Sequence, residues 1–185
     1  ERAVTLAINN LDEVAPTITS AATATAINEN AGAGQLVYTG TSTDSADISA
    51  DVSYSLKPST GDVSAFSINS ATGAVTLTDN PNFETKPSYS FTLVATDGAG
   101  NATERAVTLA VTNLNEAPVT VDSIATQTAV TNQPFSLGLQ SYFSDVDATG
   151  TFGTLSYTVT AGTLPAGLVL NSSTGVLSGT ASGVV

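Results

Sequence analysis

The stretch that decides the fold is Glu104-Arg105-Ala106-Val107-Thr108-Leu109-Ala110, which leads into Asn113-Leu114-Asn115-Glu116-Ala117-Pro118. Both parts have an earlier copy. Residues 1–7 repeat the first part without change, and Asn10-Leu11-Asp12-Glu13-Val14-Ala15-Pro16 repeats the second with Asp12 in place of Asn115 and one extra residue, Val14. The first parts begin at residues 1 and 104, so the copies lie 103 positions apart. A repeat of about 100 residues predicts two tandem domains of one architecture, each large enough to bury a core.

The same spacing recurs further along the chain. Residues 69–73 (Asn-Ser-Ala-Thr-Gly) return as residues 171–175 (Asn-Ser-Ser-Thr-Gly), 102 positions later. In the first copy, apolar and polar residues alternate on both sides of the glycine-containing turn, which predicts a β-hairpin. We expect its core-facing side chains to be Phe66, Ile68, Val75 and Leu77. The second copy predicts an equivalent hairpin over residues 168–177.

Alternation of apolar and small polar residues continues through most of the chain, and residues that favour helices are scarce. In the first full domain we expect strands at residues 17–27, 35–40, 52–57, 65–68, 74–78, 89–96 and 106–112. Short strands separated by turns about every ten residues are typical of a Greek-key sandwich. The sequence therefore predicts an all-β protein of tandem Greek-key, immunoglobulin-like β-sandwiches.

Composition excludes several classes of protein. The chain has 4 Lys and Arg against 16 Asp and Glu, a net charge of −12, which would repel nucleic acid and anionic membrane surfaces. It contains no Cys and no His, so thiol catalysis, Ser-His-Asp catalysis, zinc fingers and imidazole-ligated haem are excluded. No apolar run approaches the roughly 18 residues of a membrane helix, so no direct membrane insertion is expected.

Most acidic residues lie at strand ends and in the linkers. A single acid in a turn is explained by capping of the backbone. Several such turns at one pole of a sandwich are harder to explain, because two carboxylates 4 Å apart repel by roughly 1 kcal/mol even in water. Such a group implies a cation. A ligand set made only of oxygen favours Ca²⁺, which accepts 6 to 8 carboxylate, carbonyl and water oxygens at flexible angles.

The first domain resembles a bacterial cadherin-like repeat over essentially its whole length. Cadherins carry a glutamate on the first strand, an acid-x-glutamate motif before the sixth strand, an Ala-x-Asp motif after it, and an acidic linker that ends before Pro. The corresponding stretches here are Asn28-Glu29-Asn30, Asn82-Phe83-Glu84, Ala95-Thr96-Asp97 and residues 10–16. The second linker, residues 113–118, is one residue shorter, and the resemblance therefore implies that it binds fewer ions.

The second domain resembles the dystroglycan-type relative of cadherin domains. The resemblance is carried by Gln133-Pro134-Phe135, Phe143-Ser144-Asp145-Val146-Asp147, Leu155-Ser156-Tyr157, Leu164-Pro165-Ala166-Gly167-Leu168 and residues 173–179. Together the two resemblances imply cadherin-like β-sandwiches throughout the chain.

The repeat arithmetic and the resemblances imply four segments. Residues 1–13 are expected to be the last strand of a preceding cadherin-like repeat plus its linker, and residues 14–112 a complete cadherin-like sandwich. Residues 113–118 are expected to be a calcium-binding linker. Residues 119–185 are expected to be a dystroglycan-type sandwich that lacks its last two strands at the C-terminal end.

The resemblance also implies the metal ligands. At the boundary between the two domains they are Glu29, Asn82, Glu84, Asn113, Asn115, Glu116, Asp145 and Asp147. At the N-terminal boundary they are Asn10, Asp12, Glu13, Asp44, Asp47 and Asp97. In one respect the sequence departs from the family, because Asp44 and Asp47 are spaced Asp-x-x-Asp where cadherins have Asp-x-Asp.

Three functions are consistent with these features. In the first, Ca²⁺ between neighbouring domains of the chain stiffens an extracellular array in a bacterial cell-surface adhesin, with no catalytic role. In the second, the domains recognise a glycan, a protein or an identical chain, although no pair of exposed aromatic residues is evident for sugar stacking. In the third, two carboxylates hydrolyse a glycoside, although a sandwich seldom forms a deep cleft alone.

Overall fold

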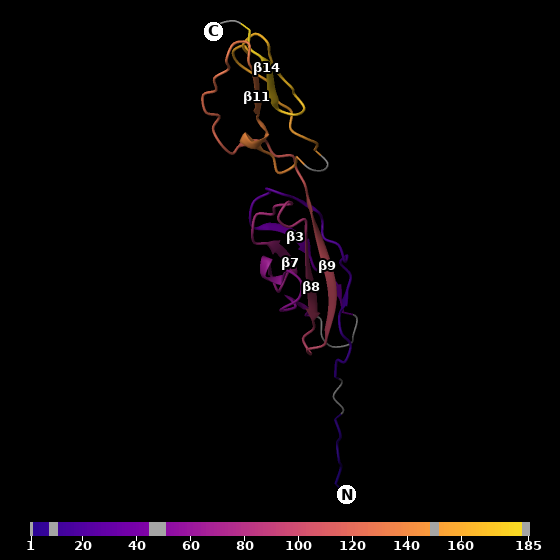
Figure 1. Ribbon diagram of the computed structural model, residues 1–185. Coiled ribbons are helices and arrows are strands. Elements are labelled where there is room, and N and C mark those ends of the chain that lie inside the picture. The colour runs from indigo at the N-terminus through magenta and orange to yellow at the C-terminus, as the bar shows by residue number, and fades with distance from the viewer. Residues whose placement is uncertain (1, 8–10, 45–50, 149–151, 183–185) are drawn as a thin grey trace. The chain divides into compact units, whose positions relative to one another are not determined.

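The computed structural model describes residues 2–7, 11–44, 51–148 and 152–182. The chain divides into two compact units, Glu1–Leu114 and Asn115–Val185 (Figure 1). Among the described residues, regular structure consists of β-strands and two short 3-10 turns, η1 (Val63–Ala65) and η2 (Gln140–Tyr142). Within the described ranges, no helix is long and apolar enough to cross a membrane.

The first unit is a sandwich of two main sheets. One sheet has four strands in the order β2-β9-β8-β5, comprising β2 (Ile27–Asn28), β9 (Ala102–Thr112), β8 (Ser88–Thr96) and β5 (Ser53–Leu56). The other has three strands in the order β3-β7-β6, comprising β3 (Gln35–Thr39), β7 (Ala74–Leu77) and β6 (Phe66–Ile68). A short antiparallel pair, β1 (Thr17–Ile18) with β4 (Ser42–Thr43), completes the unit. The strands named here pair antiparallel except β2 with β9, and the isolated Thr23–Thr108 bridge is also parallel.

The core lies between the two main sheets because alternate side chains of each strand are apolar. Phe91, Leu93 and Ala95 on β8 are at most 1% exposed. Val107 and Leu109 on the neighbouring β9 are fully buried. From the opposite sheet, the buried core residues are Val37, Tyr38, Phe66, Val75 and Leu77. The predicted all-β sandwich is therefore confirmed.

Aromatic side chains fill the centre of this core. The rings of Tyr38 and Phe91 meet edge to face, with centroids 5.6 Å apart. Phe66 contacts Phe91 at a centroid distance of 4.8 Å and Tyr89 at 5.9 Å. Contacts of this kind stabilise a core beyond simple burial, so these aromatic residues pack the sandwich.

The predicted hairpin between β6 and β7 is present. Asn69 Oδ1 accepts hydrogen bonds from the backbone N–H groups of Ala71 and Thr72, both at 3.0 Å. Gly73 has a φ of 68° and lies so close to the Gly40 carbonyl that a Cβ atom would collide with it. The turn thus requires glycine for its backbone conformation and for its close contact.

The expected strand at residues 17–27 is wrong in one respect, because the structure breaks it into β1, an isolated bridge from Thr23 to Thr108, and β2. The break lets the chain leave its pairing with β4 and pair with β9 in the four-stranded sheet. It is held by the Tyr38 hydroxyl, which lies 2.7 Å from Ser20 Oγ and 2.6 Å from the Ala21 carbonyl oxygen. Partners distant in sequence cause this break, which local alternation could not indicate.

The second unit has fewer paired strands among its described residues. Its main sheet is antiparallel in the order β11-β14-β13, comprising β11 (Pro134–Gly138), β14 (Val176–Thr180) and β13 (Leu168–Leu170). A second, short antiparallel pair is formed by β10 (Val119–Thr120) and β12 (Phe143–Ser144). The hairpin expected over residues 168–177 corresponds to β13 and β14.

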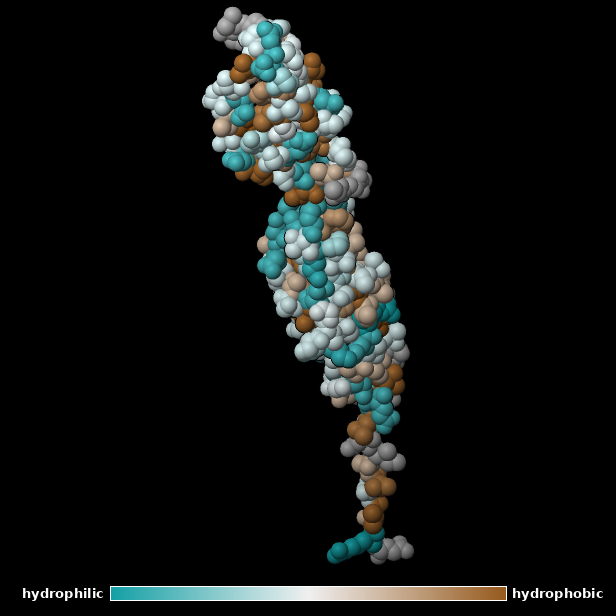
Figure 2. Space-filling model, in the orientation of Figure 1, coloured by the Kyte–Doolittle hydropathy of each residue, from teal (hydrophilic) through white to brown (hydrophobic). Residues whose placement is uncertain are grey.

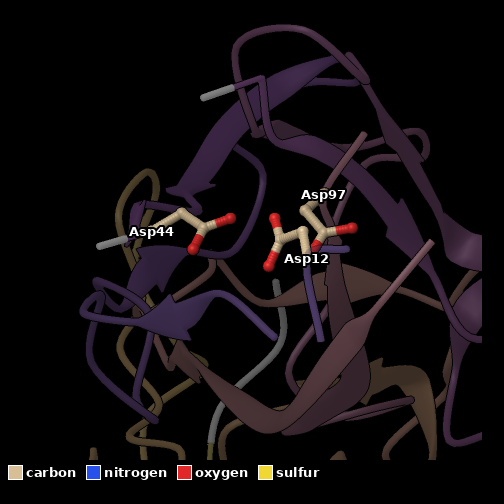
Figure 3. A group of neighbouring side chains, drawn as sticks. All are labelled: Asp12, Asp44 and Asp97. Atoms are coloured by element: carbon tan, nitrogen blue, oxygen red, sulfur yellow. The ribbon is translucent and has the colours of Figure 1, made fainter. Parts of the chain in front are cut away.

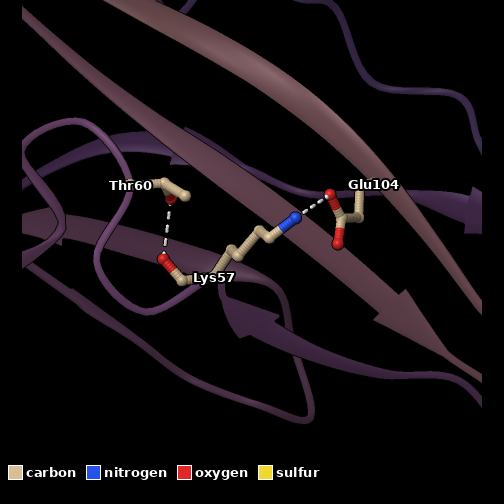
Figure 4. Close-up of polar contacts among 3 residues, drawn as sticks. All are labelled: Lys57, Thr60 and Glu104. Carbon is tan, nitrogen blue, oxygen red and sulfur yellow. Dashed lines mark hydrogen bonds and ion pairs between the residues drawn. The ribbon is translucent and has the colours of Figure 1, made fainter.

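The few basic side chains are engaged within the first unit. Lys57 Nζ lies 2.8 Å from Glu104 Oε2 on β9 (Figure 4). Lys86 pairs with Asp62 at 2.8 Å, and Arg105 donates to the Ser20 carbonyl. The Lys57 and Glu104 side chains are 45% and 48% exposed, so their pair contributes only about 0.2–1 kcal/mol. Three of the four basic residues are thus used to tie strands and loops together.

Replacing Leu93 by Ala should lower the free energy of unfolding of the first unit by about 2–5 kcal/mol, because the side chain is fully buried. Urea denaturation followed by circular dichroism measures this change. Leu36→Ala is the matched control, since Leu36 is 62% exposed on β3. A similar loss in both variants would contradict the assigned core.

Candidate metal centre

Three aspartates from separate segments meet in the first unit. Asp12 precedes β1, Asp44 directly follows β4, and Asp97 directly follows β8. One carboxylate oxygen of each lies within 4.8 Å of those of the other two (Figure 3). We call Asp12, Asp44 and Asp97 the N-terminal acidic group. The sandwich brings them together because the β1–β4 pair and the end of β8 lie at the same pole.

Asp97 is held by a tight turn between β8 and β9. Its Oδ1 accepts hydrogen bonds from the backbone N–H groups of Ala99, Gly100 and Asn101 at 2.9, 2.7 and 2.8 Å. Its Oδ2 accepts one from the Asn101 side chain at 2.9 Å. Burial raises the pKa of Asp97, but the hydrogen bonds from Asn101, Gly100 and Ala99 outweigh it, and the pKa lies below the ordinary value of 3.8. Asp97 is therefore ionised at neutral pH.

Asn101 also positions the linker. Its side-chain N–H donates to the carbonyl oxygen of Asp12 at 2.9 Å. The Asp12 carboxylate accepts a hydrogen bond from the Val14 N–H at 3.2 Å, which closes a turn before β1. The sequence prediction missed Asn101. Its only signal was its place at the end of the Asp97-Gly98-Ala99-Gly100-Asn101 turn.

A second group of oxygen ligands lies at the other end of the first unit. Glu29, directly after β2, is 1% exposed although it is an acid. Its Oε2 accepts a hydrogen bond from the Phe83 N–H at 2.9 Å, and its Oε1 accepts one from the Leu114 N–H at 2.7 Å. Burial of a carboxylate is costly unless such donors or a cation compensate. Glu29 thus fixes the loop at Phe83 and the end of β9 in one place.

Glu84 and Asn113 join Glu29 there. One carboxylate oxygen of Glu84 lies within 4.8 Å of one of Glu29. The Asn113 side-chain N–H donates to Glu84 Oε1 at 3.3 Å. Asn113 Oδ1 is buried and has no hydrogen-bond partner within the described part of the chain. We call Glu29, Glu84 and Asn113 the C-terminal oxygen group of the first unit.

The second unit has its own set of acids near its first residues. Asp147, which is 4% exposed, accepts a hydrogen bond from the Glu116 N–H at 2.7 Å through Oδ2. Asp145 Oδ1 accepts one from the Asp147 N–H at 2.9 Å. Asp147 Oδ1 is buried and has no hydrogen-bond partner among the described residues. The predicted ligands Glu116, Asp145 and Asp147 are therefore neighbours within this unit.

Five predicted ligands do not belong to these sets of side chains. Asn10 and Asp47 lie outside the described residues. Glu13 is exposed, and it is not a member of the N-terminal acidic group. Asn82 Oδ1 accepts a hydrogen bond from the Thr85 N–H at 2.7 Å, and Asn115 donates to the Glu116 carbonyl at 3.0 Å. The side chains of Asn82 and Asn115 thus hold local turns in the structure.

The oxygen atoms of these sets would suit a hard divalent cation. Each set offers only oxygen atoms, which suits Ca²⁺. The buried acceptors Asn113 Oδ1 and Asp147 Oδ1 have no donor in the described structure, and a cation would satisfy both. Lys57, Lys86 and Arg105 are engaged elsewhere, so they are not placed to neutralise these acids.

Family comparison agrees with the fold. Residues 23–112 match the family model described as "Cadherin domain". Residues 117–185 match the model described as "Putative Ig domain". Cadherin domains are typically adhesive, calcium-binding extracellular modules. The chain therefore contains a cadherin-like β-sandwich over residues 23–112, followed by a segment that matches an Ig-like domain. No curated protein matches the chain.

Solved structures with the same fold include three cadherin ectodomains. The protocadherin GammaB4 extracellular domain is 21% identical with a TM-score of 0.67, over 97% of this chain and 31% of that one. Mouse cadherin-23 EC22–24 is 21% identical with a TM-score of 0.69, over 93% of this chain and 56% of that one. Protocadherin gammaB7 EC3–6, described as a cis-dimer, is 21% identical with a TM-score of 0.69, over 93% of this chain and 45% of that one. This chain thus spans from about 31% to 56% of their lengths, and at this identity the likeness concerns the fold.

Replacing Glu29 by Ala should destabilise the first unit by about 1–3 kcal/mol per donor left without an acceptor. The affected donors are the N–H groups of Phe83 and Leu114. Urea denaturation in EDTA measures the loss without any contribution from metal, and hydrogen exchange should accelerate at these two amides. Glu84→Ala is the matched control because Glu84 is exposed. Unchanged exchange at Phe83 in the Glu29 variant would show that the carboxylate does not hold this loop.

Proposed function

We propose that this chain is a calcium-binding structural module of a bacterial cell-surface adhesin, in which Ca²⁺ at the domain junctions stiffens an extracellular array. The observation that carries the proposal is the placement of oxygen ligands at both ends of the first unit. The N-terminal acidic group lies beside the first linker, and the C-terminal oxygen group lies beside the second. Sites at both ends are what a repeating array requires.

At the second junction, the proposed ligands come from both units. Glu29, Glu84 and Asn113 belong to the first unit, and Glu116, Asp145 and Asp147 to the second. The chain joins the two sets directly, because only Leu114 and Asn115 separate Asn113 from Glu116. A cation shared by both sets would oppose bending at this linker. Without it, the carboxylates repel one another and the linker acts as a hinge.

The remaining parts of the proposal rest on sequence resemblance. Motifs at residues 28–30, 82–84 and 95–97 support a bacterial cadherin-like repeat, and those at 133–135 and 143–147 support a dystroglycan-type second domain. We assign the chain a non-enzymatic role. Its immediate partners are neighbouring domains of the same polypeptide, and a surface glycan, a protein or an identical chain would be the adhesive partner. The second candidate, a recognition module, differs in placing a ligand on the loops.

Calcium should bind weakly, with a Kd of about 10⁻⁴ to 10⁻³ M, as in other extracellular modules, and raise the melting temperature. Asp44→Asn should raise the calcium Kd of the site at the N-terminal acidic group by about tenfold and leave the other site unchanged. Glu84→Gln should do the same at the C-terminal oxygen group. Calorimetric titration and thermal denaturation with calcium or EDTA measure both effects.

The matched control is Glu104→Gln, which removes an acid that belongs to neither set and pairs with Lys57 instead. Its calcium affinity should equal that of the unaltered chain. A melting temperature that does not respond to millimolar calcium would refute calcium binding, and equal losses in all three variants would refute these sites.

Stiffening is tested separately from binding. The chain has no Cys, so Thr39→Cys with Ser136→Cys places one exposed spin label on a strand of each unit. The distance distribution between the labels should narrow when calcium is added, because the linker loses conformational freedom. Adding Glu84→Gln to this pair should remove the narrowing. A distribution that stays broad while calcium binds would refute the mechanical role and leave the binding sites intact.

A further inference from the structure

One basic residue lies close in sequence to a proposed calcium ligand. Of the four basic residues, Lys86 is the nearest to any of these ligands, two positions after Glu84. The Lys86 N–H donates to the Asn82 carbonyl at 2.9 Å, which closes a turn that contains Glu84. An ammonium group beside Glu84 would compete with Ca²⁺ for the same carboxylate. The direction of the Lys86 side chain therefore matters for the site.

The backbone of Lys86 lies at the same end of the first unit as the C-terminal oxygen group. Pro87, the next residue, accepts a hydrogen bond from the Val111 N–H at 2.9 Å. Val111 is two positions before Asn113, a member of that group. The backbone position by itself would therefore allow a positive charge beside the group.

The Lys86 side chain instead runs along β8, away from the group. Its Nζ lies 2.8 Å from Asp62 Oδ1 and 5.2 Å from the centroid of the Tyr89 ring. Tyr89 pairs with Leu109, which is four positions before Asn113 and thus about 13 Å from it along the strand direction. The ammonium group is therefore drawn toward the middle of the sheet.

Asp62, which draws it there, is fixed against β8. The Ser90 N–H donates to Asp62 Oδ2 at 2.8 Å, and the Asp62 N–H donates to the Ser90 carbonyl at 2.7 Å. Gly61 has a φ of 54° and lies so close to the Ser90 carbonyl that a Cβ atom would collide with it, so only glycine permits this contact. The hydrogen bonds from Lys86 and Ser90 outweigh burial and hold the pKa of Asp62 below its ordinary value of 3.8. Asp62 thus presents a fixed negative charge at neutral pH.

Stability alone gives this ion pair little importance. The side chains of Lys86 and Asp62 are 40% and 27% exposed, and ion pairs open to water contribute little to folding. Figure 2 shows hydrophilic and neutral residues over most of the visible face of the first unit, as expected of a surface in contact with water. In a chain of net charge −12, a lysine side chain without this partner would be attracted to other acids. The main effect of the pair is therefore on where the Lys86 charge lies.

We infer that Asp62 is a positioning residue for calcium binding at the C-terminal oxygen group, because it holds the Lys86 ammonium group away from Glu84. The inference rests on the calcium binding proposed above. Asp62 supplies no ligand, since it is neither a predicted ligand nor a member of the acidic groups in the described structure. A Lys86 side chain released from Asp62 would reach Glu84 and raise the calcium Kd without any change in the ligands themselves.

The test is a calcium titration of the full chain, followed by NMR at one amide for each site. Leu114, whose N–H donates to Glu29 Oε1, reports on the C-terminal oxygen group, and Gly100, whose N–H donates to Asp97 Oδ1, reports on the N-terminal acidic group. Asp62→Asn should raise the Kd measured at Leu114 by about three- to tenfold and leave that at Gly100 unchanged. The asparagine keeps an acceptor for the Ser90 N–H, so the loop stays docked. The effect should shrink in about 0.5 M salt, which screens the freed charge.

Lys86→Met separates charge placement from anchoring of the turn. Alone, it should leave the Kd at Leu114 unchanged or lower it, and combined with Asp62→Asn it should remove the loss. If the pair only anchored the turn, both single variants and the double variant would weaken binding alike. The matched control is Glu104→Gln, which also removes one acid and releases a lysine, Lys57, and should not change the Kd at Leu114.

Two results would overturn the inference and leave the proposed function intact. The first is an unchanged Kd at Leu114 in Asp62→Asn when Glu84→Gln raises it. The second is a loss in Asp62→Asn that persists in the double variant with Lys86→Met, which would assign the pair to anchoring. If the resonance of Leu114 does not respond to calcium in the unaltered chain, both the inference and the proposed site are wrong.

Discussion

The pairing of β8 with β9 is the interaction on which the first unit depends. It joins nine residue pairs, from Ser88 with Ala110 to Thr96 with Ala102. Its inner face supplies Phe91, Leu93, Val107 and Leu109 to the core. Its turn holds Asp97, and β9 ends one residue before Asn113. Because β8 and β9 reach both ends of the unit, the same hairpin closes the sandwich and carries proposed ligands toward both poles.

Carboxylates are concentrated where the fold can hold them. Asp97 and Glu29 are both buried, and each receives backbone hydrogen bonds that keep its charge in a fixed position. Fixed acids at the ends of a sandwich cost electrostatic free energy that a divalent cation would recover. A cation bound at a junction would therefore also stabilise the unit that supplies its ligands. This relief of repulsion is the physical basis of the proposed stiffening.

The two units differ in how fully they close. The first buries a continuous core between two sheets, whereas among the described residues of the second only Leu168 and Ala181 are buried hydrophobic residues. The proposed ligands Asp145 and Asp147 lie in the second unit, where the Asp147 N–H donates to Asp145 Oδ1.

The sequence by itself determined the all-β class, the repeat and most strand positions, because alternation and turn residues are local signals. Of the acids it predicted as ligands, Asp12, Asp44 and Asp97 lie with carboxylate oxygens within 4.8 Å of one another. Residues 74–78 and 89–96, for example, were expected as strands and correspond to β7 and β8. Tertiary structure alone decided the break between β1 and β2, where Tyr38 holds Ser20 and Ala21. It also decided the role of Asn101, which joins the Asp97 turn to Asp12 across 89 positions. Such contacts depend on how strands distant in sequence pair, and no local pattern of residues encodes that pairing.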